Sequence, residues 1–176
     1  MKAIVYIGTS LDGFIAKKND DIEWLTQFQN AEVGQEYEEF MKRIDVIVIG
    51  RGTFDKVLSF PSWPYSKKVF VLSTTIRQPP DALKKKVTII AMKPKEVLTY
   101  LSGQGQSTVY IDGGKVIQDF LKEDCIDEMI ITKVPLLIGD GIPLFGKQDK
   151  ELSFRHLQTK ILSNGLVKSF YERVRN

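Results

Sequence analysis

Two apolar runs of this chain each end in a glycine-containing turn that carries a basic residue. Residues 45–49 lead into Gly50-Arg51-Gly52-Thr53, and residues 108–112 lead into Gly113-Gly114-Lys115. A strand that passes through glycine into a helix leaves unpaired N–H groups, and the positive end of the helix dipole, directed at one place. That geometry suits phosphate. Two such turns indicate a ligand with more than one phosphate, and a dinucleotide is the obvious candidate.

Each turn also has a purely conformational explanation, because a tight strand-to-helix turn uses glycine for backbone reasons. The first turn is not the Rossmann fingerprint. Asp55 stands where the third glycine belongs, and the preceding strand is the second of the chain rather than the first. The occurrence of two turns favours the ligand over the conformational explanation.

Size and composition indicate one soluble globular domain over residues 1–176. The chain is 43% hydrophobic and 27% charged, with a net charge of +3. This mild excess does not predict a nucleic-acid partner. We expect no membrane partner and a cytoplasmic location, because the chain opens with a strand-like segment and has no apolar run of bilayer length.

The chain contains one cysteine, Cys125, and one histidine, His156. A single cysteine forms no disulfide within one chain, and the usual cysteine- or histidine-rich metal sites are excluded. We therefore predict no metal site. Cys125 has no neighbouring base and reads as a buried, inert thiol. His156, between apolar residues, reads as a strand-surface residue rather than a member of a Ser-His-Asp triad.

Strand-like and helix-like segments alternate through the first two thirds of the chain, which predicts an α/β fold. The predicted strands cover residues 2–8, 45–49, 68–73, 87–91 and 107–112. The predicted helices cover residues 31–43 and 114–122 and begin at Gly52 and Pro94, and residues 9–30 read as a long loop. The remainder predicts antiparallel strands: 126–138, interrupted at Pro135, and a hairpin of 152–162 and 166–174 around Asn164-Gly165.

Several blocks resemble the dihydrofolate reductase fold family, in order from about residue 2 to 174. Residues 46–54 are similar to the family's phosphate-binding segment, and residues 111–121 resemble its second glycine motif and helix. Residues 10–16 and 139–145 resemble the branch shared with the reductase domain of bacterial riboflavin biosynthesis. The resemblance implies a three-layer α/β/α domain whose mixed, mostly parallel sheet ends in an antiparallel C-terminal hairpin.

The resemblance implies that the cofactor is NADPH, and it assigns the phosphate contacts. Gly50, Arg51, Gly52 and Thr53 form the turn that binds phosphate oxygens, with Arg51 as a charged fork. The segment Gly113-Gly114-Lys115 would bring backbone N–H groups and a cation to the pyrophosphate.

The resemblance also assigns the two ends of the cofactor. Ser73, Thr74 and Thr75 match contacts to the adenosine 2′-phosphate, with Arg77 assisting, although a polar strand end is the alternative. Such a cationic, hydroxyl-rich corner favours NADPH over NADH. Ile15 and Ala16 would present backbone groups to the nicotinamide carboxamide, and Asp140 would hold the loop of residues 13–20.

The catalytic residues are less well defined, because the Pro-Trp signature of folate-reducing members is missing. Glu36 takes the position of the family's pocket acid, and Thr132 that of a threonine that orients the pterin. Glu36 also lies among Glu32, Glu38 and Glu39, so a solvated acidic face is an equal alternative. Asp21, Glu23 and Trp24 are rival pocket candidates.

The resemblance implies an NADPH-dependent reductase that transfers hydride to a small heterocyclic substrate. That substrate would be pterin- or aminopyrimidine-like, as for dihydrofolate reductase or 5-amino-6-(5-phosphoribosylamino)uracil reductase. A homodimer is also implied. The alternative is a non-catalytic NADP(H)-binding sensor or scaffold.

Overall fold

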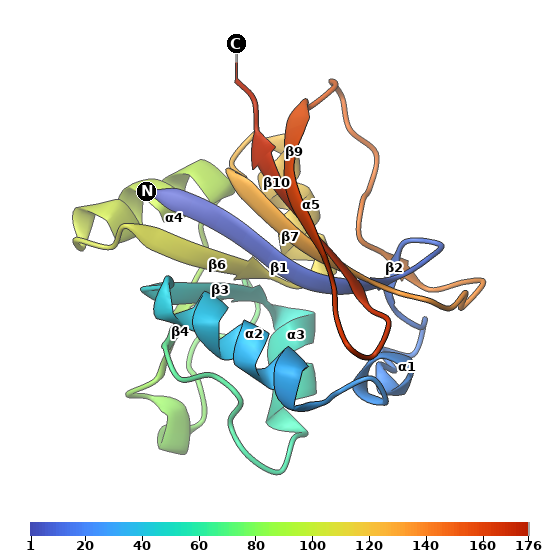
Figure 1. Ribbon diagram of the computed structural model, residues 1–176. Coiled ribbons are helices and arrows are strands. Elements are labelled where there is room, and N and C mark those ends of the chain that lie inside the picture. Colours follow the sequence, from blue (N-terminus) through green and yellow to red (C-terminus); the bar gives the residue numbers. More distant parts are fainter. Residues whose placement is uncertain (176) are drawn as a thin grey trace.

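A mixed sheet of eight strands runs through the computed structural model, which describes residues 1–175 (Figure 1). The strand order is β5-β4-β3-β6-β1-β7-β10-β9. The first six strands in this order are parallel to one another, and β10 is antiparallel to both of its neighbours. The bounds are β1 (Lys2–Ser10), β3 (Val46–Gly50), β4 (Lys68–Leu72), β5 (Val87–Ile90), β6 (Thr108–Asp112), β7 (Glu128–Val134), β9 (Phe154–Ile161) and β10 (Val167–Arg173). The predicted α/β fold with an antiparallel C-terminal hairpin is confirmed.

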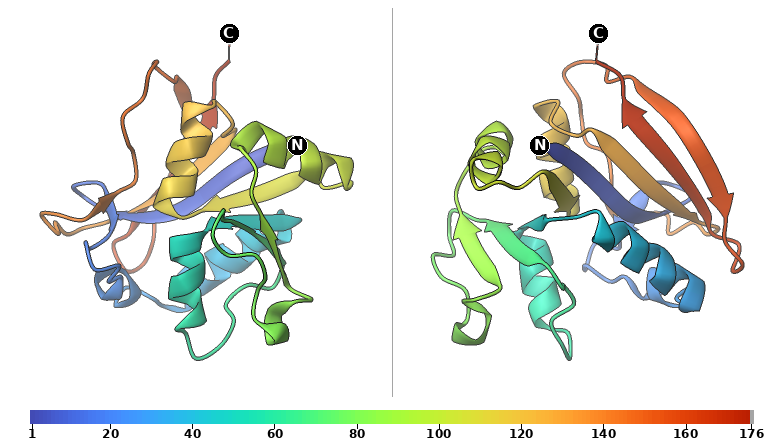
Figure 2. Two further views of the ribbon diagram at one scale, coloured as in Figure 1. Left: turned by 180° about the vertical axis from the view of Figure 1, so that it is seen from behind. Right: turned by 60° about the vertical axis from the view of Figure 1, so that its left-hand side comes forward.

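Helices cover both faces of this sheet (Figure 2). On one face lie α2 (Ala31–Lys42) and α3 (Arg51–Leu58), and on the other lie α4 (Pro94–Gly103) and α5 (Gly114–Lys122). Each helix buries one apolar stripe, as an amphipathic surface helix does. Within residues 1–175, no helix combines the length and the hydrophobicity needed to cross a bilayer.

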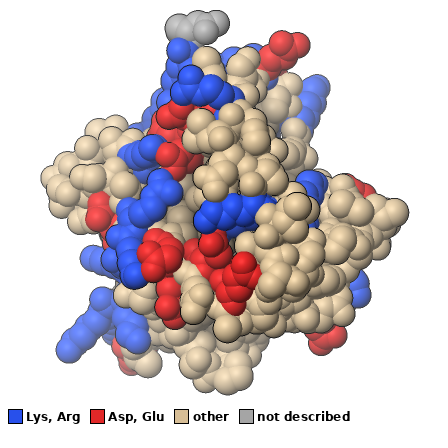
Figure 3. Space-filling model, in the orientation of Figure 1, with Lys and Arg blue, Asp and Glu red and all other residues tan. Residues whose placement is uncertain are grey.

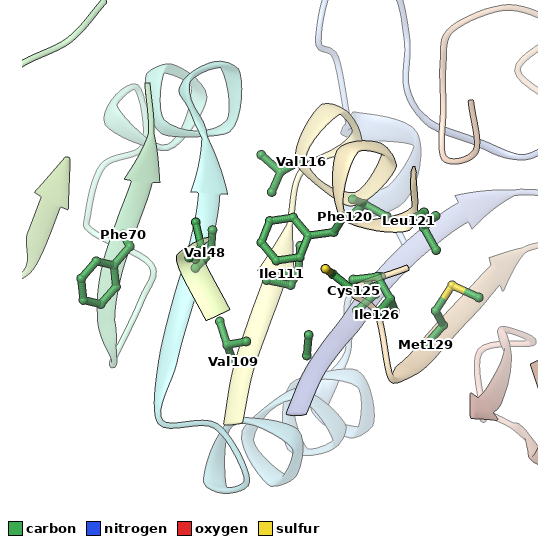
Figure 4. Close-up of a cluster of buried hydrophobic side chains, with 14 of the residues drawn as sticks. Val48, Phe70, Val109, Ile111, Val116, Phe120, Leu121, Cys125, Ile126 and Met129 are labelled. Carbon is green, nitrogen blue, oxygen red and sulfur yellow. The ribbon is translucent and has the colours of Figure 1, made fainter. Parts of the chain in front are cut away.

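The core is built from strands that are apolar on both faces. In β3, residues 46–49 are all buried, which is why the segment reads as a continuous apolar run. Figure 4 shows the α5 face, where the Phe120 ring lies beside Ile111 of the sheet and Leu121 lies farther along the same cluster. Cys125 is buried in the same cluster, as predicted.

Two sequence predictions need correction. Residues 9–30 are not one loop, because they contain a short strand β2 (Phe14–Ala16), which pairs with β8 (Ile142–Pro143), and a helix α1 (Glu23–Thr26). The β2–β8 pairing joins distant segments, so no local pattern announces it. The predicted strand 126–138 is shorter: β7 ends at Val134 because Pro135 has no N–H for the ladder.

Candidate functional site

The two glycine turns lie side by side at one edge of the sheet. Strands β3 and β6 are neighbours, and Ile49 is the register partner of Asp112. Helix α3 starts directly after Gly50 and α5 directly after Gly113. The N-termini of both helices therefore face the same place, outside the carboxyl ends of the parallel strands, where α/β sheets bind their ligands.

The second turn requires glycine at position 113. Gly113 has φ of +93°, and a Cβ built on it would lie 2.3 Å from the Thr53 hydroxyl of α3. A Cβ on Gly114 would lie 2.7 Å from the Ile15 side chain. The two turns are thus packed against each other, and bare backbone faces the space above them. This cradle fits a pyrophosphate, which needs close backbone approach.

One cavity of about 910 Å³ collects all of the residues predicted to bind the cofactor. This volume lies at the upper end of the roughly 300–1,000 Å³ of small-molecule sites. The predicted residues that line the cavity are Ile15, Ala16, Gly50, Arg51, Gly52, Thr53, Ser73, Thr74, Thr75, Gly113, Gly114 and Lys115. They come from four separate segments, so the tertiary structure brings together what the sequence only placed in order.

A cationic, hydroxyl-rich corner forms where β4 ends beside α3. The Arg51 guanidinium donates from Nη1 to Thr75 Oγ1 at 2.7 Å and from Nε to Asp55 at 3.2 Å. Ser73 Oγ accepts the Thr75 and Ile76 N–H groups at 3.2 and 3.0 Å, which shapes the turn after β4. Arg51 therefore belongs to the hydroxyl corner as much as to the first glycine turn.

Two polar contacts hold the loop that carries Ile15 against the 139–143 segment. The Asp12 carboxylate accepts from the Ser10 hydroxyl at 2.5 Å and from the Gly139 N–H at 2.7 Å. These hydrogen bonds, that from Ser10 first, lower the pKa of Asp12. Lys18 pairs with Asp140, so Asp140 contacts the loop that it was expected to hold.

Next to the second glycine turn, the cavity wall is aromatic and contains a carboxyl group. Tyr6, Tyr37, Tyr65 and Tyr110 line it together with Asp112. Asp112 accepts from the Tyr65 hydroxyl at 3.0 Å and from the Gly113 N–H at 2.8 Å. Burial raises the pKa of Asp112, so its neutral form persists to higher pH than in an ordinary aspartate. Burial, with the Asp112 carboxylate nearby, also raises the pKa of Tyr65 and Tyr110.

The two tentative catalytic residues lie behind this wall, on α2 and β7. Glu36 accepts from Lys168 Nζ at 2.8 Å and from Lys160 Nζ at 3.3 Å, and the Lys168 hydrogen bond lowers its pKa. Figure 3 shows acidic and basic side chains side by side on this face of the molecule. Thr132 lies between Gly8 and Lys168 in the sheet register. A catalytic role for either residue stays a prediction.

The rival pocket candidates near α1 have other contacts. Asp21 Oδ1 accepts the Glu23 N–H at 2.8 Å at the start of α1, and Trp24 packs in a separate cluster with Leu162. The same segment lines the cavity through Asp20, Ile22 and Leu25.

The sequence analysis did not single out Asp112, Tyr6 and Lys168. The first two line the tyrosine-rich part of the cavity, and Lys168 contacts Tyr6. Asp112 had a readable signal, since an acid at the carboxyl end of a buried parallel strand lies at the ligand edge of the sheet. The signal for Lys168 was weak: it is a lysine in a strand where polar and apolar residues alternate only in part. Tyr6 looked like an ordinary core residue within the apolar run of β1.

Comparison with known proteins agrees with this geometry. The family model described as RibD C-terminal domain matches residues 2–168. The chain belongs to the RibD C-terminal domain family. The uncharacterized protein YwjB of Bacillus subtilis (strain 168) is 37% identical over 162 residues, which cover 90% of this chain and 91% of YwjB.

Solved structures extend the comparison. A putative riboflavin biosynthesis protein from Shewanella sp. PV-4 superposes with a TM-score of 0.94 at 44% identity, covering 99% of this chain and 100% of that protein. Dihydrofolate reductase from Enterococcus faecalis, complexed with NADP(H) and RAB-propyl, superposes with a TM-score of 0.64 at 15% identity, covering 98% and 96%. The dihydrofolate reductase-like fold and the relationship to the riboflavin branch are both confirmed.

Proposed function

We propose that this RibD-type domain is an NADPH-dependent reductase of a small heterocyclic substrate. The observation that carries the proposal is one cavity that joins both glycine turns to an aromatic, acid-containing end. The first part fits a dinucleotide, and the second fits a flat ring. Their continuity would put a bound nicotinamide and a bound heterocycle in contact.

The chain's residues divide the binding of NADPH among them. Arg51, Ser73 and Thr75 would surround the 2′-phosphate. The backbone of Gly113 and Gly114 would lie against the pyrophosphate, while the Gly113 N–H itself donates to Asp112. When bound, NADPH supplies a hydride from its nicotinamide ring. The protein contributes position and the exclusion of water.

Asp112 is our candidate for the proton that accompanies the hydride. Reduction of a C=N or C=O bond adds hydride to carbon and a proton to nitrogen or oxygen. Asp112 is the acid of the aromatic end, and its raised pKa favours the protonated form that can donate. The surrounding tyrosine rings suit a pterin- or aminopyrimidine-like ring.

The test is NADPH consumption, followed at 340 nm, with dihydrofolate, a dihydropterin and 5-amino-6-(5-phosphoribosylamino)uracil as acceptors. A thermal-shift comparison of NADPH with NADH accompanies it. We expect NADPH to raise the melting temperature, because a ligand that binds only the folded state adds about 2.7 kcal/mol to the free energy of unfolding at 100-fold its Kd. If neither nucleotide shifted the melting temperature, the assignment of NADPH as cofactor would be wrong, and so would the proposed function.

The second candidate is a non-catalytic NADP(H)-binding sensor or scaffold. It is favoured by Glu36, which stands at the position of the expected pocket acid but is engaged by Lys160 and Lys168. Tight NADPH binding without turnover of any acceptor would select this candidate over the reductase.

We also keep the homodimer as a proposal. Strand β9 is an edge of the large sheet, and Leu157 and Ile161 on it are 51% and 78% exposed. Exposed apolar residues on an edge strand suit a protein partner. Light scattering should give twice the chain mass, and an Ile161→Lys variant should shift it toward the monomer.

A further inference from the structure

We infer that Tyr6 is a substrate-contacting hydrogen-bond donor, held in its donating state by the buried pair Lys168–Glu36. The inference deepens the proposed function and rests on it. It concerns three residues that lie far apart in the chain, on β1, α2 and β10.

Lys168 is a buried cation, with 2% of its side chain exposed. Its ammonium donates to Glu36 Oε2 at 2.8 Å and to Tyr6 Oη at 3.0 Å, and it lies 4.4 Å from the centre of the Tyr6 ring. Removing a lysine from water is costly, and an ion pair rarely repays the cost better than apolar packing. A role in stability alone is therefore a weak explanation for a lysine at this position.

The Lys168–Tyr6 contact fixes the direction of the tyrosine's own proton. An ammonium group has donors and no acceptor, so the Tyr6 oxygen must accept from Lys168. The Tyr6 O–H is then left to donate elsewhere. Among the hydrogen bonds of residues 1–175, the Tyr6 hydroxyl takes part only as this acceptor. Accepting a charged donor also polarises the O–H bond and strengthens its donation.

Tyr6 lines the cavity, whereas its ring is held by packing. It stacks on Phe40 at 4.5 Å between centroids and meets Tyr37 edge-on at 5.7 Å. The Tyr110 hydroxyl donates to the Tyr6 backbone carbonyl at 2.9 Å. A ring that is stacked on one face, met edge-on by a second ring and held at its backbone has little freedom to redirect the hydroxyl. The natural acceptor for the Tyr6 proton is a carbonyl oxygen or ring nitrogen of the heterocycle.

Glu36 acts through Lys168 in this arrangement. Its carboxylate neutralises the buried ammonium and orients it toward Tyr6. Lys168 and Glu36 are therefore positioning residues, and the predicted importance of Glu36 would come from a contact behind the pocket wall rather than from proton donation.

The experiment is a double-mutant cycle of Tyr6→Phe and Lys168→Met. It uses NADPH and whichever acceptor of the panel above the wild type reduces fastest. Tyr6→Phe keeps the ring and removes only the hydroxyl. We expect kcat/KM to fall about tenfold or more in each single variant. In the Tyr6→Phe background, Lys168→Met should add less than a twofold change, because residues that act as a unit are non-additive.

Two measurements separate this role from a structural one. The Kd of NADPH, by calorimetry, should stay within twofold in both variants, which also shows that they are folded. Tyr100→Phe is the matched control, since Tyr100 packs on α4 against Phe70, away from the site. It should leave kcat/KM unchanged.

The outcomes distinguish failure of this inference from failure of the proposed reductase function. A wild type that reduces an acceptor, with a Tyr6→Phe variant of equal kcat/KM, overturns the inference alone. Additive losses in the double variant overturn the coupling of Lys168 to Tyr6. A wild type that binds NADPH but reduces no acceptor, or that binds no NADPH, overturns the reductase and the inference together.

Discussion

Replacing Arg51 with alanine should weaken NADPH binding far more than NADH binding. The Arg51 guanidinium contacts Thr75 at 2.7 Å, within the hydroxyl corner where the 2′-phosphate would lie. A charge-assisted hydrogen bond contributes about 1.5–3 kcal/mol. The Arg51 side chain is 54% exposed, so solvent screening moves the expectation toward the lower limit. At about 1.5 kcal/mol the Kd of NADPH rises roughly 12-fold.

NADH lacks the 2′-phosphate, so its Kd should change by less than about twofold. Calorimetry of both nucleotides on the wild type and the variant gives the four values required. Arg155→Ala is the matched control, because it removes the same charge from the hairpin, where Arg155 contacts Glu172 at 2.5 Å. Higher ionic strength should shrink the Arg51 effect, since an exposed contact is screened.

Two results would refute this reasoning. An NADPH Kd within twofold of the wild type would remove Arg51 from the cofactor site. Equal losses for NADPH and NADH would keep Arg51 in the site but move it from the 2′-phosphate to a phosphate that both nucleotides share.

Three further variants, and one control variant, test other parts of the protein. Asp112→Asn should lower kcat about 100-fold or more, as expected for a lost general acid. Burial raises the pKa of Asp112, so the wild type should lose stability as pH rises from about 3.8 through that raised value, and thermal melts of Asp112→Asn should lack this loss. Gly113→Ala should cost about 1–3 kcal/mol in urea denaturation, because its φ is +93°, whereas Gly34→Ala, with open space in α2, should gain roughly 0.5–1 kcal/mol; equal effects would contradict the turn geometry. The lowered pKa of Asp12 predicts a loop contact that is present above about pH 3.8 and lost as pH falls below it, and Asp12→Asn should speed hydrogen exchange of the Gly139 amide at neutral pH; unchanged exchange would show that the contact does not hold the loop.

The sequence predicted residues that the structure gathers around one cavity, which is where we propose that the cofactor binds. The glycine turns and the hydroxyl segment after β4 are local features, because each lies within a few residues of a strand end. Parallel strands bring such ends to one edge of the sheet, so local features became a common site once the strand order was correct. The order of blocks shared with the dihydrofolate reductase fold supplied that order.

The substrate side could not be predicted in the same way, because its contacts are non-local. Glu36 was singled out by its position on a helix, but its partner Lys168 lies on the last strand of the sheet. Tyr6 was one apolar residue among several in β1. Only the tertiary contact with Lys168 indicates a role for its hydroxyl.

The sequence therefore determined the class of fold and, together with the family resemblance, the residues that we propose face a dinucleotide. The tertiary structure decided which polar groups face the substrate end and which lie behind it. Burial is the physical reason: the same carboxyl or ammonium group is an ordinary surface charge in water, and it acquires a raised pKa or a fixed direction only when the fold removes that water.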